Sequence, residues 1–280
     1  MKIDGETKVY GLVGHPVAHS LSPLIQNTAF RELGINAVYV VFDVTDLSGA
    51  MEGIRGLHIE GVNITIPWKH EVLPFLDEIT ETARLAGAVN TVMRKENRLI
   101  GTNTDVSGLI RLFRRRGFQW EGKPVAIIGA GGAARAVTIA LKSIGARPVV
   151  FNRKGDIHLA VELSEDLGCP FYPLETLSIS RDTVAVINCT PVGMSPDVSA
   201  TPIPISLLRG DLVVMDAVYS PVQTRFLRAA EELGCTTIPG TEWLIAQGAD
   251  SFKFWTGRDA PEETIKKTLL EWTNGGGSFY

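Results

Sequence analysis

The chain has 280 residues, a length that favours two domains, and its 45% hydrophobic and 21% charged side chains exclude wholesale disorder. Its formal net charge of −4, from 27 basic and 31 acidic residues, disfavours a nucleic-acid partner. The longest stretch without Asp, Glu, Lys or Arg covers residues 9–30 and contains histidines and prolines. We therefore expect no membrane span and no membrane partner.

The three cysteines, Cys169, Cys189 and Cys235, are far apart and show no metal-ligand spacing. We expect free, reduced thiols. Residues 1–6 lack the apolar core of a signal peptide, so the predicted location is the cytoplasm. None of the five histidines pairs with a cysteine or a carboxylate at ligand spacing, so no metal site is predicted.

Short apolar runs alternate with amphipathic segments along the chain. The sequence predicts strands over residues 9–13, 37–42, 61–66, 125–128, 148–151, 184–188 and 212–216. It predicts helices over residues 23–33, 106–116, 133–144 and 223–233. Each of these helices is followed by a glycine, which favours a helix end. This alternation is typical of an α/β fold with parallel sheets covered by helices. We expect the glycine-rich tail, residues 274–277, to fray.

Two boundaries divide the chain. One falls at residues 105–123, where a helix ends in arginines and a glycine, and the other falls near residue 240, before a helical stretch that closes the chain. We predict that residues 1–104 and 242–280 form one domain with a mixed or parallel sheet. Residues 105–241 are predicted to form a Rossmann-like dinucleotide-binding domain, with a cleft between the two domains.

Ser20-Leu21-Ser22-Pro23 suits a helix start, with Ser22 as the N-cap and Pro23 at the first helical position. That interpretation leaves Ser20 without a role. Two hydroxyls beside the free amides of a helix N-terminus also form a seat for a small carboxylate.

Residues 63–70 are predicted to end a strand and to start a helix after Pro67. Lys69 would then lie in the first helical turn, where the helix dipole favours its neutral form. The alternative is an ordinary solvated lysine. Before the next predicted helix, Thr104 or Asp105 would serve as the cap.

Residues 125–135 form a G-x-G-x-x-A turn between a strand and a long helix. In such a turn Gly129 permits the tight bend, Gly131 lets the backbone approach a pyrophosphate, and Ala134 allows the helix to pack closely on the strand. The first helical amides then offer donors to the phosphates. The alternative is a tight turn that binds no ligand.

The end of the second strand of this unit indicates which nicotinamide cofactor it binds. An NAD site usually has an acidic residue there, which binds the ribose hydroxyls. This chain has Asn152, Arg153 and Lys154, and two cations favour a 2′-phosphate. NADP(H) is therefore the predicted cofactor, while Asp156, two positions further on, leaves NAD open.

Several motifs recur together in a fixed order and spacing. They are Ser-Leu-Ser-Pro, Asn-Ile-Thr-Ile-Pro-Trp-Lys, Ala-Gly-Ala-Val-Asn-Thr at 86–91, Asn-Thr-Asp at 103–105, Gly-Ala-Gly-Gly-Ala-Ala-Arg, Asn-Arg, Asn-Cys-Thr-Pro-Val-Gly-Met at 188–194 and Ala-Gln-Gly-Ala at 246–249. From about residue 8 to about residue 255 the chain resembles the shikimate dehydrogenase family. The resemblance implies an open two-domain α/β protein that reversibly reduces 3-dehydroshikimate to shikimate with NADPH, in the shikimate pathway of aromatic amino-acid biosynthesis.

The resemblance also implies roles for single residues. Lys69 would be the catalytic acid/base, paired with Asp105, and carbonyl reduction without a metal needs one such well-placed acid. The residues implied to bind the substrate are Ser20, Ser22, Thr65, Lys69, Asn90, Asp105, Tyr219 and Gln247. The residues implied to bind the cofactor are Glu81, Gly129, Ala130, Gly131, Gly132, Ala133, Ala134, Asn152, Arg153, Lys154, Thr190, Ala217 and Gly240.

Two positions depart from the family pattern. Ile157 stands where the family usually has a second basic residue, a charge that Lys154 could replace, and Arg225 stands where the family often has proline. We have no functional interpretation of Arg225. Two alternatives stay open: a quinate/shikimate dehydrogenase with mixed NAD and NADP use, and a catalytically silent NADP-binding sensor. Retention of Lys69 and Asp105 argues against the sensor. The predicted partner is a small-molecule substrate, and the sequence leaves a homodimer open.

Overall fold

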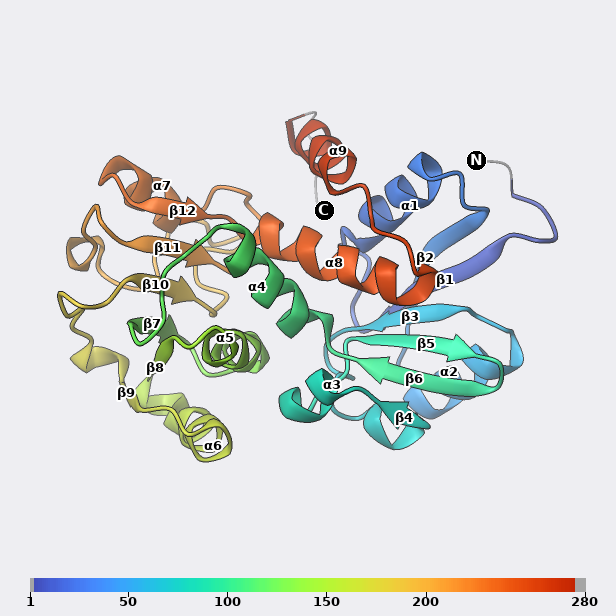
Figure 1. Ribbon diagram of the computed structural model, residues 1–280, viewed down its shortest axis with the longest axis horizontal. Helices are drawn as coiled ribbons and strands as arrows, with labels where there is room; N and C mark the ends of the chain where they lie inside the picture. The colour runs from blue at the N-terminus through green and yellow to red at the C-terminus, as the bar shows by residue number, and fades with distance from the viewer. Residues whose placement is uncertain (1–2, 275–280) are drawn as a thin grey trace. The chain divides into compact units, whose positions relative to one another are not determined.

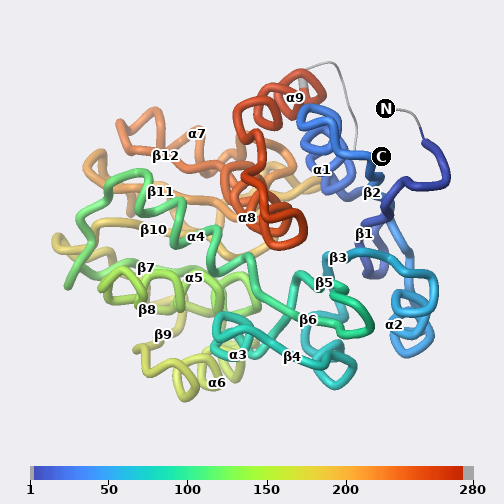
Figure 2. Tube along the Cα trace, turned by 45° about the vertical axis from the view of Figure 1, so that its right-hand side comes forward, coloured from blue at the N-terminus to red at the C-terminus, as the bar shows by residue number. Residues whose placement is uncertain are grey.

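The computed structural model describes residues 3–274, so residues 275–277 of the predicted tail lie outside the described residues. The chain divides into two compact units, the first made of residues 1–108 and 245–280, the second of residues 109–244. Each unit contains one sheet with helices packed on it (Figures 1 and 2). The predicted α/β fold class is confirmed.

A six-stranded mixed sheet forms the centre of the first unit. Its strand order is β2 (Ala37–Asp43), β1 (Lys8–Gly14), β3 (Gly61–Ile64), β5 (Thr91–Lys95), β6 (Arg98–Thr102) and β4 (Glu78–Ile79). β1 is parallel to both of its neighbours, whereas β5 runs antiparallel to β3 and β6. The helices of this unit are α1 (Ser22–Glu32), α2 (Leu47–Gly56), α3 (Glu81–Ala86) and α9 (Glu262–Asn274). The boundaries between the units fall within α4 (Thr104–Arg115) and α8 (Gly240–Thr256).

Successive residues of β3 point to opposite faces of this sheet. Val62 and Ile64 pack into the apolar cluster that α2 shares with the sheet, whereas Asn63 bonds to Ser251 of α8. The indole nitrogen of Trp255, also in α8, donates to a backbone carbonyl of β5 at 2.9 Å. The second half of α8 therefore covers one face of the first sheet, and α2 covers the other.

The second unit is a parallel sheet of six strands. Their order is β12 (Thr236–Ile238), β11 (Val213–Asp216), β10 (Ala185–Asn188), β7 (Pro124–Ile128), β8 (Arg147–Asn152) and β9 (Phe171–Pro173). The helices between these strands are α5 (Gly132–Ser143), α6 (Ile157–Leu167) and α7 (Arg225–Glu232). The chain runs outward from β7 to β9 and then returns to β10 on the other side of β7. A reversal of this kind is the switch point at which open α/β sheets bind ligands.

The predicted helix after Pro67 is wrong. Residues 68–72 form turns, followed by a single 3-10 turn at Leu73–Phe75. The carbonyl of Lys69 accepts a hydrogen bond from the N–H of Val89 at 2.8 Å, not from the residue four positions later. Because an α-helix needs that carbonyl for its own ladder, this contact prevents the helix from forming. The helix-dipole argument for a neutral Lys69 is therefore wrong as well.

Gly108 of α4 lies against the backbone of α8. A Cβ at this position would be 2.8 Å from the amide nitrogen of Gln247 and 3.0 Å from the carbonyl carbon of Ala246. Backbone atoms cannot turn aside as the end of a flexible side chain can. Gly108 therefore sets the spacing between the first half of α4 and the part of α8 that holds Gln247.

We expect Gly108→Ala to lower the free energy of unfolding by about 1–3 kcal/mol, because the added methyl group overpacks this contact. Gly53→Ala is the matched control. Gly53 lies inside α2 with nothing within 4 Å of its Cβ position. The same change there should raise the free energy of unfolding by about 0.5–1 kcal/mol. Denaturant titrations followed by circular dichroism measure both values, and effects of equal sign would contradict the packing explanation.

Candidate active site

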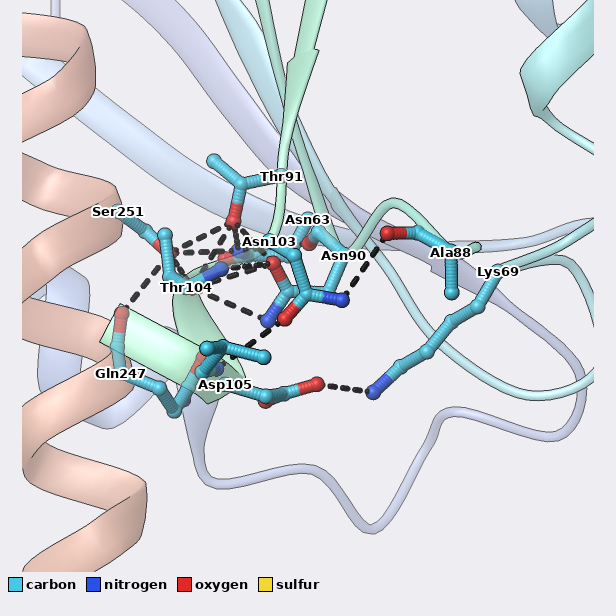
Figure 3. Close-up of polar contacts among 11 residues, drawn as sticks. Asn63, Lys69, Ala88, Asn90, Thr91, Asn103, Thr104, Asp105, Gln247 and Ser251 are labelled. Atoms are coloured by element: carbon cyan, nitrogen blue, oxygen red, sulfur yellow. Dashed lines mark hydrogen bonds and ion pairs between the residues drawn. The ribbon is translucent and has the colours of Figure 1, made fainter. Parts of the chain in front are cut away.

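Lys69 and Asp105 form an ion pair in the first unit. Lys69 lies in the turns that follow β3, and Asp105 is the second residue of α4. The Lys69 Nζ donates to Asp105 Oδ2 at 2.7 Å (Figure 3). The two side chains are 32% and 17% exposed, so both are shielded but reachable by a small molecule. The contact expected from the sequence is present, and its geometry suits proton transfer.

Buried polar groups fix the start of α4 and therefore Asp105. The cap is Asn103, whose Oδ1 accepts from the N–H of Val106 at 3.2 Å. The Nδ2 of Asn103 donates to the carbonyl of Ala88 at 3.0 Å. The prediction that Thr104 or Asp105 is the cap is wrong, because both residues lie inside the first helical turn and Asn103 precedes it.

Asn90, predicted to bind the substrate, is only 3% exposed and bonds to Thr104 through both ends of its amide. Its Oδ1 accepts from the backbone N–H of Thr104 at 2.8 Å, and its Nδ2 donates to the Thr104 hydroxyl at 3.0 Å. Asn90 therefore supports the first turn of α4. Binding of a substrate hydroxyl by Asn90 stays a prediction.

Ser251 lies at the centre of the same polar cluster and was not identified from the sequence (Figure 3). Its hydroxyl is fully buried and lies 2.9 Å from that of Thr91 and 3.0 Å from that of Thr104. It accepts from Asn63 Nδ2 at 3.0 Å and donates to the carbonyl of Gln247 at 3.0 Å. One spacing could have revealed it: Ser251 follows Gln247 by four residues and so shares its face of α8.

Ser22 does not cap α1 as predicted. The helix begins at Ser22, the residue before it is Leu21, and no side chain caps it. The hydroxyl of Ser20 instead accepts from the N–H of Ser22 at 3.1 Å. The N-cap prediction for Ser22 is therefore wrong, because the helix starts one residue earlier than expected and Ser20 has the local structural role.

A buried phenol links Ser22 to the polar cluster. Burial raises the pKa of Tyr39 far above its ordinary value, and a hydrogen bond from Ser22 opposes that rise. The Tyr39 hydroxyl donates to Asn63 Oδ1 at 2.8 Å.

Thr65, predicted to bind the substrate, lies against Gly14 at the end of β1, since a Cβ on Gly14 would be 2.3 Å from Thr65 Cγ2.

The first unit therefore holds most of the residues predicted to bind the substrate. They are Ser20, Ser22, Thr65, Lys69, Asn90, Asp105 and Gln247. Tyr219 belongs to the second unit, where burial raises the pKa of its phenol. Glu81 is an exposed residue at the start of α3 in the first unit, whereas all other predicted cofactor residues lie in the second.

In the second unit the predicted cofactor residues follow the carboxyl ends of five parallel strands. They are residues 129–134 after β7, residues 152–154 at the end of β8, Thr190 after β10, Ala217 after β11 and Gly240 after β12. Carboxyl ends of parallel strands meet at one edge of a sheet, the edge at which open α/β folds bind nucleotides.

The turn after β7 fits a pyrophosphate. Gly129 has a φ of +102°, which disfavours any residue with a side chain, and a Cβ there would be 2.9 Å from Thr190 Cγ2. Gly131 and Gly132 are exposed and have nothing within 4 Å of their Cβ positions. No side chain caps α5, so its first amides are available to an anion.

Arg153 and Lys154, the two cations after β8, are exposed, as a binding site for a 2′-phosphate requires. Arg153 is 75% exposed and pairs with Asp156 at 2.5 Å. Asn152 is buried, and its Nδ2 donates to the carbonyl of Asp156 at 2.6 Å. Together with the open turn after β7, these residues fit NADP(H).

Asp216, at the end of β11, was also missed by sequence reasoning. It is fully buried, and this burial raises its pKa. It accepts from Asn188 Nδ2 at 2.8 Å, from the N–H of Val218 at 3.0 Å and from the Thr224 hydroxyl at 2.7 Å. The carboxyl group therefore holds the loop after β11, in which Ala217 and Tyr219 lie.

All three cysteines are free. Among residues 3–274, no group of three or more His, Cys, Asp or Glu side chains is placed to hold a metal ion. Over the same residues, no helix has both the length and the apolar character that crossing a membrane requires.

The fold, together with the residues at the carboxyl ends of the second sheet, is that of a two-unit dinucleotide-binding protein. Two family models match the chain: the shikimate dehydrogenase substrate binding domain over residues 12–92 and the shikimate 5′-dehydrogenase C-terminal domain over residues 240–270. The NADP(+) shikimate dehydrogenase of Pyrococcus furiosus is 44% identical over 96% of this chain and 98% of its own.

Solved structures show the same similarity. A shikimate dehydrogenase in complex with NADP+ matches with a TM-score of 0.89, at 38% identity over 96% of this chain and 97% of its own. The enzyme of Thermus thermophilus, in complex with NADP(H) and shikimate, matches with a TM-score of 0.86, at 36% identity over 95% of this chain and 99% of its own. This chain belongs to the shikimate dehydrogenase family, and the resemblance seen in its motifs is confirmed.

We expect Ser251→Ala to lower the free energy of unfolding by about 1–3 kcal/mol, because it leaves buried donors of the cluster without an acceptor. Ser143→Ala is the matched control: the Ser143 hydroxyl donates to the carbonyl four residues earlier, as that of Ser251 does, and no further hydrogen bond of it is found in the described structure. That change should stay within about 0.5 kcal/mol of the wild type. Thermal and denaturant unfolding measure the difference, and equal losses would argue against the cluster.

Proposed function

We propose that this chain catalyses the reversible NADPH-dependent reduction of 3-dehydroshikimate to shikimate, a step of aromatic amino-acid biosynthesis. The observation that carries the proposal is the Lys69–Asp105 ion pair, in a chain that belongs to the shikimate dehydrogenase family. An acid–base pair held at 2.7 Å and open to a small molecule is what reduction of a ketone requires of the protein.

The proton moves through Lys69. In the reducing direction its ammonium donates a proton to the carbonyl oxygen, and in the oxidising direction the neutral amine accepts the proton of the hydroxyl group. NADPH, when bound, supplies the hydride. Asp105 accepts one of the Lys69 N–H groups and so aims the remaining donors at the substrate.

We assign the other substrate contacts to side chains whose polar groups suit the carboxylate and the hydroxyl groups of the substrate. Ser20 and Ser22 bind the carboxylate through their hydroxyls. Thr65, Asn90 and Gln247 bind the ring hydroxyls, with Asp105 beside them. Tyr219, in the second unit, contributes its phenol near the carboxylate.

The second unit is the NADP-binding domain in this proposal, and residues 1–104 with 242–280 form the substrate domain. The amides after β7 bind the pyrophosphate, and Arg153 with Lys154 binds the 2′-phosphate. Asn152 and Thr190 support these loops, Ala217 and Gly240 bind near the nicotinamide, and Glu81 is the one cofactor residue that we assign to the substrate domain.

Two further expectations accompany the reaction. The free cysteines suit a reducing compartment, so we place the activity in the cytoplasm. A homodimer stays a prediction, which the molar mass in solution from light scattering would test.

We expect Lys69→Ala to reduce kcat for shikimate oxidation by about 10²- to 10⁴-fold while the affinities for shikimate and NADP+ change little. Asp105→Asn should also slow turnover, with a smaller effect in the double variant than the sum of the two. Lys69→Arg should not restore activity, because a guanidinium group stays protonated. The matched control is Lys253→Ala, since Lys253 also pairs with an aspartate at 2.7 Å but is 61% exposed. Near-normal kcat in Lys69→Ala would refute the proposed catalyst.

We expect Arg153→Ala to weaken NADPH binding by about 1.5–3 kcal/mol and NADH binding much less, because only NADPH has a 2′-phosphate to pair with the guanidinium. The control is Arg147→Ala, at the opposite end of β8, where the side chain donates to the carbonyl of Gly122. Fluorescence titration gives the dissociation constants. Equal losses for the two cofactors would show that Arg153 does not contact the phosphate.

A further inference from the structure

A carboxylate faces the arginine that is proposed to bind the 2′-phosphate. Arg153 Nη2 donates to Asp156 Oδ2 at 2.5 Å, and the two side chains are 75% and 40% exposed. A second carboxylate, that of Glu175, lies 3.5 Å from the backbone nitrogen of Lys154. The two cations of the seat are therefore accompanied by two negative charges.

We infer that Asp156 determines how strongly this chain prefers NADP to NAD: its carboxylate competes with the 2′-phosphate for Arg153 and repels it. The inference rests on the proposed function, of which it specifies the choice of cofactor. A 2′-phosphate bears nearly two negative charges at neutral pH and must displace or share the Arg153–Asp156 bond. NAD has a neutral hydroxyl in that place, which is not repelled and can donate to a carboxylate.

Asp156 bonds to the neighbouring turn through its backbone atoms. The backbone N–H of Asp156 donates to the carbonyl of Arg153 at 3.0 Å, and its carbonyl accepts from Asn152 at 2.6 Å. Asp156 is also the residue before α6, where an aspartate normally caps the helix, yet its side chain makes no capping bond. Its charge is thus directed at Arg153, and the local backbone is held by other atoms.

Asp156→Asn isolates this charge, because asparagine keeps an oxygen that can accept from Arg153. Calorimetric titration of the variant and the wild type with NADP+, NAD+, 2′,5′-ADP and 5′-AMP gives dissociation constants without turnover. We expect NADP+ and 2′,5′-ADP to bind about threefold to tenfold more tightly to the variant, with NAD+ and 5′-AMP unchanged or weaker. In about 1 M salt the gain should nearly vanish, since exposed charges are then screened.

Asp211→Asn is the matched control. Asp211 is 68% exposed and pairs with Arg209 at 2.8 Å before β11, at the amino end of the strands. It removes the same charge from the same unit and should leave all four dissociation constants unchanged.

A ratio of NAD+ to NADP+ dissociation constants that Asp156→Asn leaves unchanged or lowers would overturn the inference, and so would an equal gain in Asp211→Asn. Such results would leave the proposed reaction intact, because shikimate oxidation by the wild type is measured separately. A wild type that binds 2′,5′-ADP no better than 5′-AMP would overturn the phosphate seat itself, together with the inference.

Discussion

Two neighbouring residues, Val89 and Asn90, place both partners of the acid–base pair. The N–H of Val89 donates to the carbonyl of Lys69 and keeps that segment out of a helix. The side chain of Asn90 bonds to both the backbone N–H and the hydroxyl of Thr104. Asp105 follows directly in α4. Because buried amides and hydroxyls are costly to leave unpaired, this segment before β5 can satisfy its partners in few arrangements. The 2.7 Å contact between Lys69 and Asp105 is a consequence of that constraint.

In the second unit, close backbone packing fixes the loop after β11, which contains Ala217 and Tyr219. Gly240 lies so close to the loop after β11 that a Cβ on it would be 2.7 Å from the carbonyl of Ala217. Asp216 holds the same loop from inside through the N–H of Val218. A glycine and a buried carboxyl group thus fix the segment that contains Tyr219, while Gly131 and Gly132, exposed in the turn after β7, leave the backbone open to a ligand, as a dinucleotide site requires.

Patterns within the sequence predicted the strands and turns that depend on the residues of one short segment. Apolar runs identified all the central parallel strands, and the glycine turn after β7 was found from its spacing. The strands β5 and β6 were missed because they contain charged residues such as Arg94 and Arg98, so their apolar pattern is interrupted. Contacts between distant segments could not be foreseen: the Val89–Lys69 bond removed a predicted helix, and the partners of Ser251 come from three segments far from it in sequence. The pairing of Lys69 with Asp105 was expected only because several motifs together resembled one family.

Initial rates of the wild-type chain with shikimate or quinate, each with NADP+ or NAD+, test the proposed reaction most directly. Absorbance of the reduced nicotinamide follows all four pairs under one set of conditions. We predict the highest kcat/KM for shikimate with NADP+, and a lower value for shikimate with NAD+. A higher kcat/KM for quinate with NAD+, or no turnover of shikimate with either cofactor, would contradict the proposed function.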